Sequence, residues 1–223
     1  IFSCDKVETI GIDAFRFSGF IGDFNCPELQ TVGYNAFRNS QFDGAFECPN
    51  LSSVGTSAFA YSQFTGEFNC PNLTQIYDYA FEISQFTGTF NCPNLTSVGN
   101  DAFRNSQFND VFECQKLQTV GMGAFLYSVF TGVFNCQNLQ TVGNGAFRYS
   151  QFNGEFNCPK LQAVGNVAFG NSDFTNITIG ANATLGTGCI GAHSAEFIND
   201  YAANGKLAGT YVWDEATQHW IYQ

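Results

Sequence analysis

One stretch decides the fold of this chain: Cys92-Pro93-Asn94-Leu95-Thr96-Ser97-Val98-Gly99-Asn100-Asp101-Ala102-Phe103-Arg104-Asn105-Ser106-Gln107-Phe108. Variants of it recur along most of the sequence, and the interval between its successive cysteines is always 22 residues. The cysteines on this spacing are Cys4, Cys26, Cys48, Cys70, Cys92, Cys114, Cys136 and Cys158. A constant period of roughly 20 to 50 residues is typical of a solenoid, in which each unit buries its apolar face only against its neighbours. We therefore expect a rod of stacked coils.

The apolar residues keep constant places in each unit, numbered from its cysteine as position 1. Phe fills positions 12, 17 and 21, and these three columns hold 24 of the 26 phenylalanines. The run Phe-x-Gly-x-Phe-x-Cys alternates with period two, which predicts a strand whose Phe and Cys side chains face inward. Pro after the cysteine ends that strand, and Ala-Phe at positions 11 and 12 fits a short helical turn. We predict an α/β, β-rich, right-handed solenoid with one short parallel strand and one helical or 3₁₀ turn per repeat.

The cysteine column argues against disulfides. Neighbouring in-register strands lie about 4.8 Å apart with parallel side chains, whereas a disulfide needs Cβ atoms about 3.8 Å apart on converging vectors. We therefore expect buried free thiols that act as small hydrophobic side chains. Zinc is not expected, because the sequence has no Cys-x-x-Cys pair and no histidine cluster.

The repeat also resembles a known family. The series Phe-Thr-Gly-x-Phe-x-Cys-Pro, followed by Leu-Thr-x-Val-Gly-x-x-Ala-Phe-x-x-Ser, is similar to the BspA-like (Treponema-type) leucine-rich repeat over residues 1 to about 180. The chain departs from the family pattern in three ways: Phe replaces many leucines, Cys stands where Ile precedes Pro, and the unit is one residue shorter between Pro and Val. The resemblance implies a leucine-rich-repeat solenoid in a secreted or cell-surface protein of a host-associated bacterium or parasitic protist, with adhesion as a role of several members.

The repeat pattern lapses after Phe174, and a different C-terminal segment follows. Residues 194–203 are predicted to form a helix that Ser194 can cap and Gly205 ends. Residues 207–213 and 219–222 alternate enough to form a β-hairpin.

This C-terminal segment fits the role of a cap. A repeat array needs terminal caps that cover its last apolar face, and Trp213 and Trp220 suit that role. We therefore divide the chain into a leucine-rich-repeat array over residues 1–180 and a capping segment over residues 181–223, with a separate ligand module as the alternative for the second part. At the other end, residues 1–4 match the end of a unit, so we expect that the array begins mid-repeat and that an upstream piece, with any export signal, has been removed.

Composition narrows the range of partners. The formal net charge is −11, 12% of residues are charged and 17% are aromatic. Few charges and many aromatic residues exclude disorder. Eight basic residues make nucleic acid a poor partner, because its binding depends on Lys and Arg. No run approaches the roughly 18 apolar residues of a membrane-spanning helix.

Little in the sequence suggests catalysis. The two histidines, His193 and His219, lie in the tail without a recognisable nucleophile motif. A Cys189–His193 pair could support papain-like chemistry, but a core cysteine beside a surface histidine is the reading we favour. Calcium-binding Asp-x-Asp-x-Asp loops do not occur. We predict no enzyme activity, no cofactor and no metal site.

One candidate binding surface is acidic. Positions 16, 18, 20 and 22, the outward rows of the predicted strand, carry acidic residues and no basic ones. We call these the acidic rows, and they comprise Asp23, Asp43, Glu47, Glu67, Glu113, Glu155 and Asp173. Such a face would favour a cationic patch on a partner. The alternative is that these acids keep a repetitive edge soluble and unstacked.

A second candidate surface combines arginine with aromatic residues at positions 13 and 14. We call it the Arg–aromatic row, and it comprises Arg16, Phe17, Arg38, Tyr61, Arg104, Tyr127, Arg148 and Tyr149. Arg and Tyr are enriched at interface hot spots. The alternative is that these long side chains merely cover the Phe columns beneath them.

We therefore predict a monomeric, extracellular or cell-surface adhesion module that recognises a host-matrix or cell-surface protein through one repeat face. A passive stalk and a glycan-binding module are the alternatives.

Overall fold

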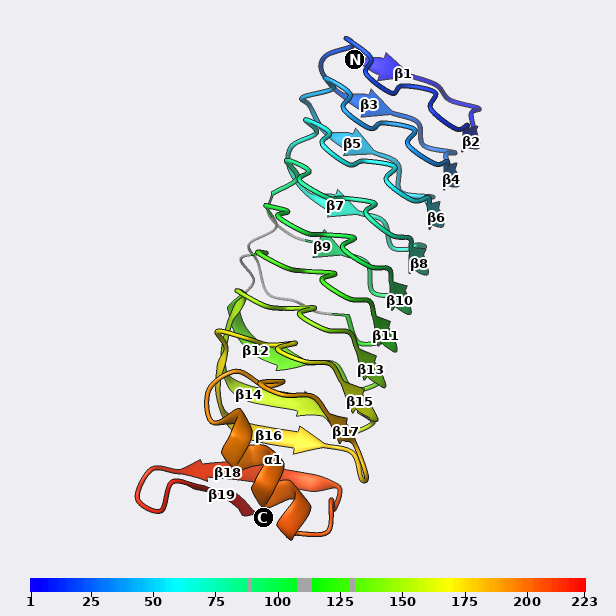
Figure 1. Ribbon diagram of the computed structural model, residues 1–223. Helices are drawn as coiled ribbons and strands as arrows, with labels where there is room; N and C mark the ends of the chain where they lie inside the picture. Colours follow the sequence, from blue (N-terminus) through cyan, green and yellow to red (C-terminus); the bar gives the residue numbers. More distant parts are fainter. Residues whose placement is uncertain (88–89, 108–113, 129–130) are drawn as a thin grey trace.

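The chain forms a rod of stacked coils with its N-terminus at one end and a helix with two strands at the other (Figure 1). The computed structural model describes residues 1–87, 90–107, 114–128 and 131–223. The coils make about eight turns. This confirms the solenoid fold class that the 22-residue period predicts.

One column of parallel strands corresponds to the predicted Phe-x-Cys strand. Phe2 aligns with Phe24, and Phe24 aligns with Phe46, so equivalent positions of successive coils are in register. The column contains β1 (Phe2–Ser3), β3 (Phe24–Asn25), β5 (Phe46–Glu47), β7 (Phe68–Asn69), β9 (Phe90–Asn91), β12 (Thr131–Asn135), β14 (Gln151–Cys158) and β16 (Asp173–Ile179).

A second column of strands, which the sequence did not lead us to expect, comes from positions 6 and 7. It forms a continuous nine-stranded parallel sheet. Its members are β2 (Thr9–Ile10), β4 (Thr31–Val32), β6 (Ser53–Val54), β8 (Gln75–Ile76), β10 (Ser97–Val98), β11 (Thr119–Val120), β13 (Thr141–Val142), β15 (Ala163–Val164) and β17 (Thr184–Leu185). From β2 to β15 the Val or Ile of each strand faces the core and its neighbour is more exposed, so two residues per coil suffice for a half-buried strand.

The Ala-Phe segments form turns with hydrogen bonds of 3₁₀ type but no continuous helix. In the second coil the Arg38 N–H donates to Asn35 O at 3.0 Å and the Ser40 N–H donates to Phe37 O at 3.1 Å, which are bonds of 3₁₀ type. They do not propagate into a helix, because Asn35 and Asn39 have φ of 54° and 56°. Backbone amides instead bond to the next coil, as in Phe37 N–H to Ala58 O at 2.7 Å.

Stacked phenylalanine rings fill the core. At position 12 a continuous column runs from Phe15 to Phe169, with neighbouring ring centroids 4.9 to 5.2 Å apart. Rings of different columns meet edge to face, as in Phe24 with Phe37 at 4.9 Å. Both arrangements are favourable for aromatic pairs. Each coil therefore buries its apolar residues against the coils above and below it.

The C-terminal elements cover the last coil. They are α1 (Ser194–Ala203), β18 (Gly209–Asp214) and β19 (His219–Tyr222), and β18 pairs antiparallel with β16. The helix and hairpin agree with the sequence prediction, but Ser194 does not cap α1. Its Oγ instead accepts a hydrogen bond from the Ile190 N–H at 3.3 Å, and His193 with φ of 53° occupies the N-cap.

The cap also has its own core. Trp220 is buried against Phe197, with ring centroids 5.3 Å apart, and Trp213 is buried beside it. The array's second sheet extends to β17, beyond residue 180. The division of the chain at residue 180 stays a prediction. Among the described residues no helix has the length and apolar character that a bilayer crossing requires.

Candidate binding surface

The Arg–aromatic row lies at a corner of the coils where the backbone is left-handed. Every described residue at position 14 has positive φ: Phe17, Asn39, Tyr61, Ile83, Asn105, Tyr127, Tyr149 and Asn171. Position 10 shares this property, and Val167 there has φ of 48°. Such values are uncommon outside Gly and Asn and are a real strain for bulky side chains. The repeat therefore projects large side chains outward from a conformation that costs free energy.

Three arginines of this row lie over its rings. The Arg148 guanidinium carbon is 4.7 Å from the Tyr149 centroid, that of Arg16 is 5.1 Å from Phe17, and that of Arg38 is 5.6 Å from Tyr61. These distances fit cation–π contacts. The contacts hold long side chains in place, which lowers the entropy that a partner would have to overcome.

The row is densest at the sixth and seventh coils. The Tyr127 and Tyr149 rings stack with centroids 4.5 Å apart and an interplanar angle of 6°. Arg148 covers Tyr149, and both Tyr127 and Arg148 are exposed. We call Tyr127, Arg148 and Tyr149 the tyrosine stack.

Arg104 has a different environment. Its Nη1 lies 3.9 Å from Asp101 Oδ1. Burial raises the pKa of Asp101 and also of Glu82, and the positive charge of Arg104 partly opposes both shifts. Arg104 therefore balances two acids along the row, whereas Arg148 lies over an aromatic ring.

The acidic rows have two kinds of member. Asp43 Oδ1 accepts the Gly22 N–H at 2.7 Å, and Asp23 Oδ1 accepts the Ala45 N–H at 3.0 Å, so these two carboxylates connect adjacent coils. The other described members are exposed: Glu47, Glu67, Glu155 and Asp173. Glu113 lies outside the described residues. Part of the acidic pattern thus has a structural cause.

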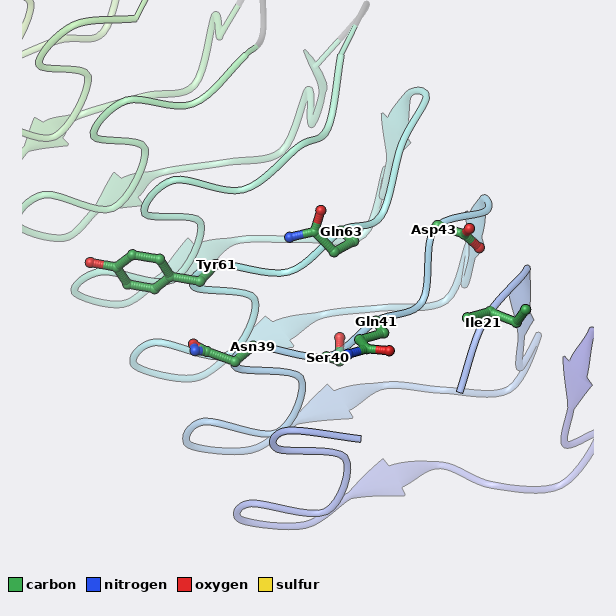
Figure 2. Close-up of a pocket in the computed structure, with 7 residues that line it drawn as sticks. All are labelled: Ile21, Asn39, Ser40, Gln41, Asp43, Tyr61 and Gln63. Carbon is green, nitrogen blue, oxygen red and sulfur yellow. The ribbon is translucent and has the colours of Figure 1, made fainter. Parts of the chain in front are cut away.

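The two predicted surfaces meet at one hollow on the first three coils. Asp43 of the acidic rows and Tyr61 of the Arg–aromatic row both line it, as Figure 2 shows. Its volume is about 590 Å³, and it is open to solvent. The sequence did not indicate this hollow, because its residues come from three coils and four repeat positions.

Three exposed tyrosines were not among the predicted surface residues. Tyr34, Tyr77 and Tyr79 are 48%, 44% and 39% exposed at positions 9, 8 and 10 of their coils. Tyr77 replaces the glycine that position 8 otherwise carries. This break in the glycine column is visible in the sequence and could have marked Tyr77 as an exposed candidate.

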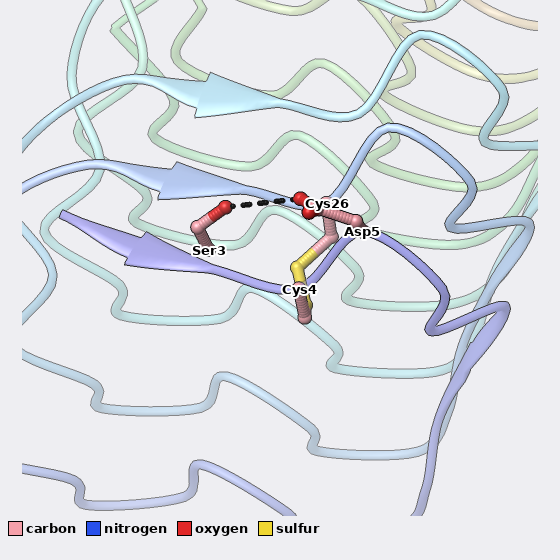
Figure 3. The surroundings of a disulfide bond; sticks show 4 residues. All are labelled: Ser3, Cys4, Asp5 and Cys26. Carbon is pink, nitrogen blue, oxygen red and sulfur yellow. Dashed lines mark hydrogen bonds between the residues drawn. A yellow bond between two sulfur atoms is a disulfide. The ribbon is translucent and has the colours of Figure 1, made fainter.

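The expectation of unpaired thiols is wrong for the first two repeat cysteines. Cys4 and Cys26 form a disulfide, with Cα atoms 4.8 Å apart (Figure 3). This separation lies within the range of disulfides, so stacking in register does not exclude the bond. Buried free thiols occur at Cys48, Cys70, Cys92, Cys136, Cys158 and Cys189, and Cys114 is also buried. Burial raises the pKa of Cys48 to about 12 and raises that of Cys70 further.

Cys189 is not paired with His193. Its sulfur lies 3.7 Å from Ser194 Oγ, while the His193 ring stacks on Trp213 at 3.8 Å. Burial raises the pKa of the Cys189 thiol, which disfavours the nucleophilic thiolate. Within the described ranges no group of three or more His, Cys, Asp or Glu side chains is arranged to hold a metal ion.

Comparison with known proteins identifies the repeat. The family model described as "BspA type Leucine rich repeat region" matches in six copies, over residues 2–109 and 74–194. A leucine-rich repeat protein from Bacteroides ovatus ATCC 8483, known from its crystal structure, is 15% identical, with 84% of this chain and 70% of that chain covered and a TM-score of 0.36. A search of curated proteins found no match. The extent of the family match shows that the chain belongs to the BspA-type leucine-rich repeat family.

Proposed function

We propose that the chain is a non-catalytic adhesion module that binds a protein partner through its Arg–aromatic row. Leucine-rich repeats of this kind indicate a protein-interaction or structural module. Proteins of the family are typically surface-associated, which supports an extracellular or cell-surface location and a host-matrix or cell-surface partner. A monomeric state stays part of the proposal.

The tyrosine stack is the observation that carries this proposal. It combines two stacked rings with an exposed arginine, the residue types that dominate hot spots. Its tyrosines, at φ of 61° and 70°, occupy a conformation that Asn would adopt at lower cost. Packing alone does not account for this choice, because Asn39, Asn105 and Asn171 fill the same position in other coils.

The acidic rows would orient the partner. Glu47, Glu67 and Glu155 are exposed on the column of β1 to β16. Charges at the rim of an interface steer association more than they add affinity. The partner we propose therefore presents a cationic patch beside a surface that accepts aromatic side chains.

The test compares binding of two triple variants to purified extracellular-matrix proteins and to host cells, by biolayer interferometry and a cell-adhesion assay. The first variant removes the tyrosine stack by Tyr127→Ser, Arg148→Ala and Tyr149→Ser. The matched control, Gln118→Ala, Gln140→Ala and Gln162→Ala, changes three residues at position 5 of the sixth, seventh and eighth coils.

We expect the first variant to lose about tenfold or more in affinity, since hot-spot residues each contribute about 1 kcal/mol or more. The control should bind as the unchanged protein does. Equal binding by all three proteins would support a passive stalk and refute the proposal. Thermal unfolding of each variant separates loss of binding from loss of fold.

A further inference from the structure

The hollow on the first three coils is lined by Asp43 of the acidic rows, by Tyr61 of the Arg–aromatic row, and by five further residues that the protein-docking proposal does not use. Figure 2 shows Tyr61 and Asn39 at one side, Ile21 and Asp43 at the other, and the two glutamines between them. Gln41, Asp43 and Gln63 are exposed, so their polar groups are accessible.

The lining matches the chemistry of hydroxyl groups. A primary amide offers two donors and one acceptor oxygen, and a carboxylate offers only acceptors. Asn39, Gln41 and Gln63 supply amides and Asp43 supplies the carboxylate. A sugar hydroxyl both donates and accepts, so neighbouring hydroxyls on one ring can pair with alternating groups of this kind. Pockets that orient a ligand use a few such groups beside apolar walls, and Ile21 and Tyr61 provide those walls.

Two local contacts hold the lining in place. Asp43 Oδ1 is fixed by the Gly22 N–H at 2.7 Å, which restrains the carboxylate. Arg38 lies 5.6 Å over the Tyr61 ring and restrains the aromatic wall. Ser40 also belongs to the lining but is fully buried, and its Oγ lacks a hydrogen-bond partner among the described residues, as do those of Ser62 and Ser84 at the same position of other coils, so the argument does not rest on it.

The charge of the hollow selects among sugars. Among the described residues, Asp43 is the one charged residue that lines it. A carboxylate-bearing sugar would meet like charge at Asp43. We infer that this hollow binds a neutral saccharide of one or two rings, with Gln41, Asp43 and Gln63 bonding its hydroxyls and Tyr61 contacting its apolar face.

The inference is independent of the protein partner and is tested with defined sugars. Saturation-transfer NMR and titration calorimetry would use the methyl glycosides of galactose, glucose, mannose and N-acetylglucosamine, with sialyllactose as the anionic probe. The variants are Gln63→Ala and Asp43→Asn, the second of which keeps an oxygen for the Gly22 N–H. Gln107→Ala is the matched control, because Gln107 is also exposed at position 16 but does not line the hollow.

We expect at least one neutral glycoside to bind and sialyllactose not to bind. Gln63→Ala should weaken binding of the neutral glycoside about fivefold or more, since a lost hydrogen bond contributes about 1 kcal/mol. Asp43→Asn should also weaken binding of the neutral glycoside, and it should improve binding of sialyllactose because the like charge is removed. Gln107→Ala and the triple variant of the tyrosine stack should leave sugar binding unchanged. No binding of any neutral probe, or equal binding by the Gln63→Ala variant, would overturn the inference without touching the protein-docking proposal.

Discussion

Replacement of Val167 by asparagine should stabilise the protein. Val167 has φ of 48°, a value held by hydrogen bonds from its N–H to Thr187 O at 2.8 Å and from the Gly170 N–H to its carbonyl at 3.0 Å. A β-branched residue is a genuine outlier there, whereas Asn35 adopts φ of 54° at the same repeat position. The side chain is already 38% exposed, so little apolar burial is lost.

The expected gain in stability is the difference between two contributions, the relief of backbone strain and the loss of apolar burial. A left-handed conformation costs an L-residue about 1–2 kcal/mol, and asparagine avoids part of this by local hydrogen bonding. The partly exposed methyl groups of Val167 contribute about 0.5 kcal/mol of burial that would be lost. The net gain is about 1 kcal/mol, which corresponds to about 2–4 °C in Tm for a chain of this size.

The test measures Tm by differential scanning calorimetry for the Val167→Asn variant and for a control variant, Val133→Asn. Val133 is 46% exposed but lies in the extended strand β12, so its replacement relieves no strain. We expect Val133→Asn to be neutral or destabilising by up to about 1 kcal/mol. If Val167→Asn lowers Tm as much as Val133→Asn does, the reasoning about backbone strain is refuted.

Two further predictions concern the sulfur column. Because burial raises the pKa of folded Cys48 to about 12 while an unfolded thiol titrates near its ordinary value of 9.0, the folded state binds the proton more tightly. Between those pH values the free energy of unfolding should therefore fall about 1.4 kcal/mol per pH unit more steeply in the unchanged protein than in the Cys48→Ala variant. Parallel curves of unfolding free energy against pH, measured by denaturant titration, would contradict this. Reduction of the Cys4–Cys26 disulfide, which closes a separation of 22 residues, should destabilise the first coil by about 3 kcal/mol. Hydrogen exchange should then speed up at the Phe2 and Cys4 amides and not at Cys136, and uniform acceleration along the rod would argue against a local effect.

The sequence predicts the parts of the fold that repeat with a strong apolar signal. The Phe columns, the inward cysteines and the α1–hairpin cap follow from spacing and alternation, because burial of large apolar side chains dominates their placement. The second sheet was missed because two-residue strands such as Thr31–Val32 show no alternation over their length. The left-handed corners were missed because Tyr, Ile and Val do not signal positive φ, although Asn35 at position 10 and Asn39, Asn105 and Asn171 at position 14 could have done so.

The candidate sites follow the same division. The rows that carry Arg148 and Glu67 are repeat positions and are therefore visible in the sequence. The tyrosine stack depends on ring geometry, and the hollow depends on which side chains of three neighbouring coils approach each other. The Cys4–Cys26 bond was missed because we treated strand spacing as fixed, whereas the Cα separation of 4.8 Å permits it.

Deletion of one whole coil tests the central claim, which is that the chain is a stack of equivalent coils whose functions lie on their outward rows. Removal of residues 50–71 joins Pro49 to Asn72, keeps the repeat in phase and should let Phe37 stack on Phe81 in place of Phe59. Circular dichroism and thermal unfolding should show a cooperatively folded protein with somewhat lower Tm, because array stability is approximately a sum over coils and their interfaces. Removal of residues 50–60, half a coil, should abolish the folded state. Loss of folding in the whole-coil deletion, or tolerance of the half-coil deletion, would contradict the account.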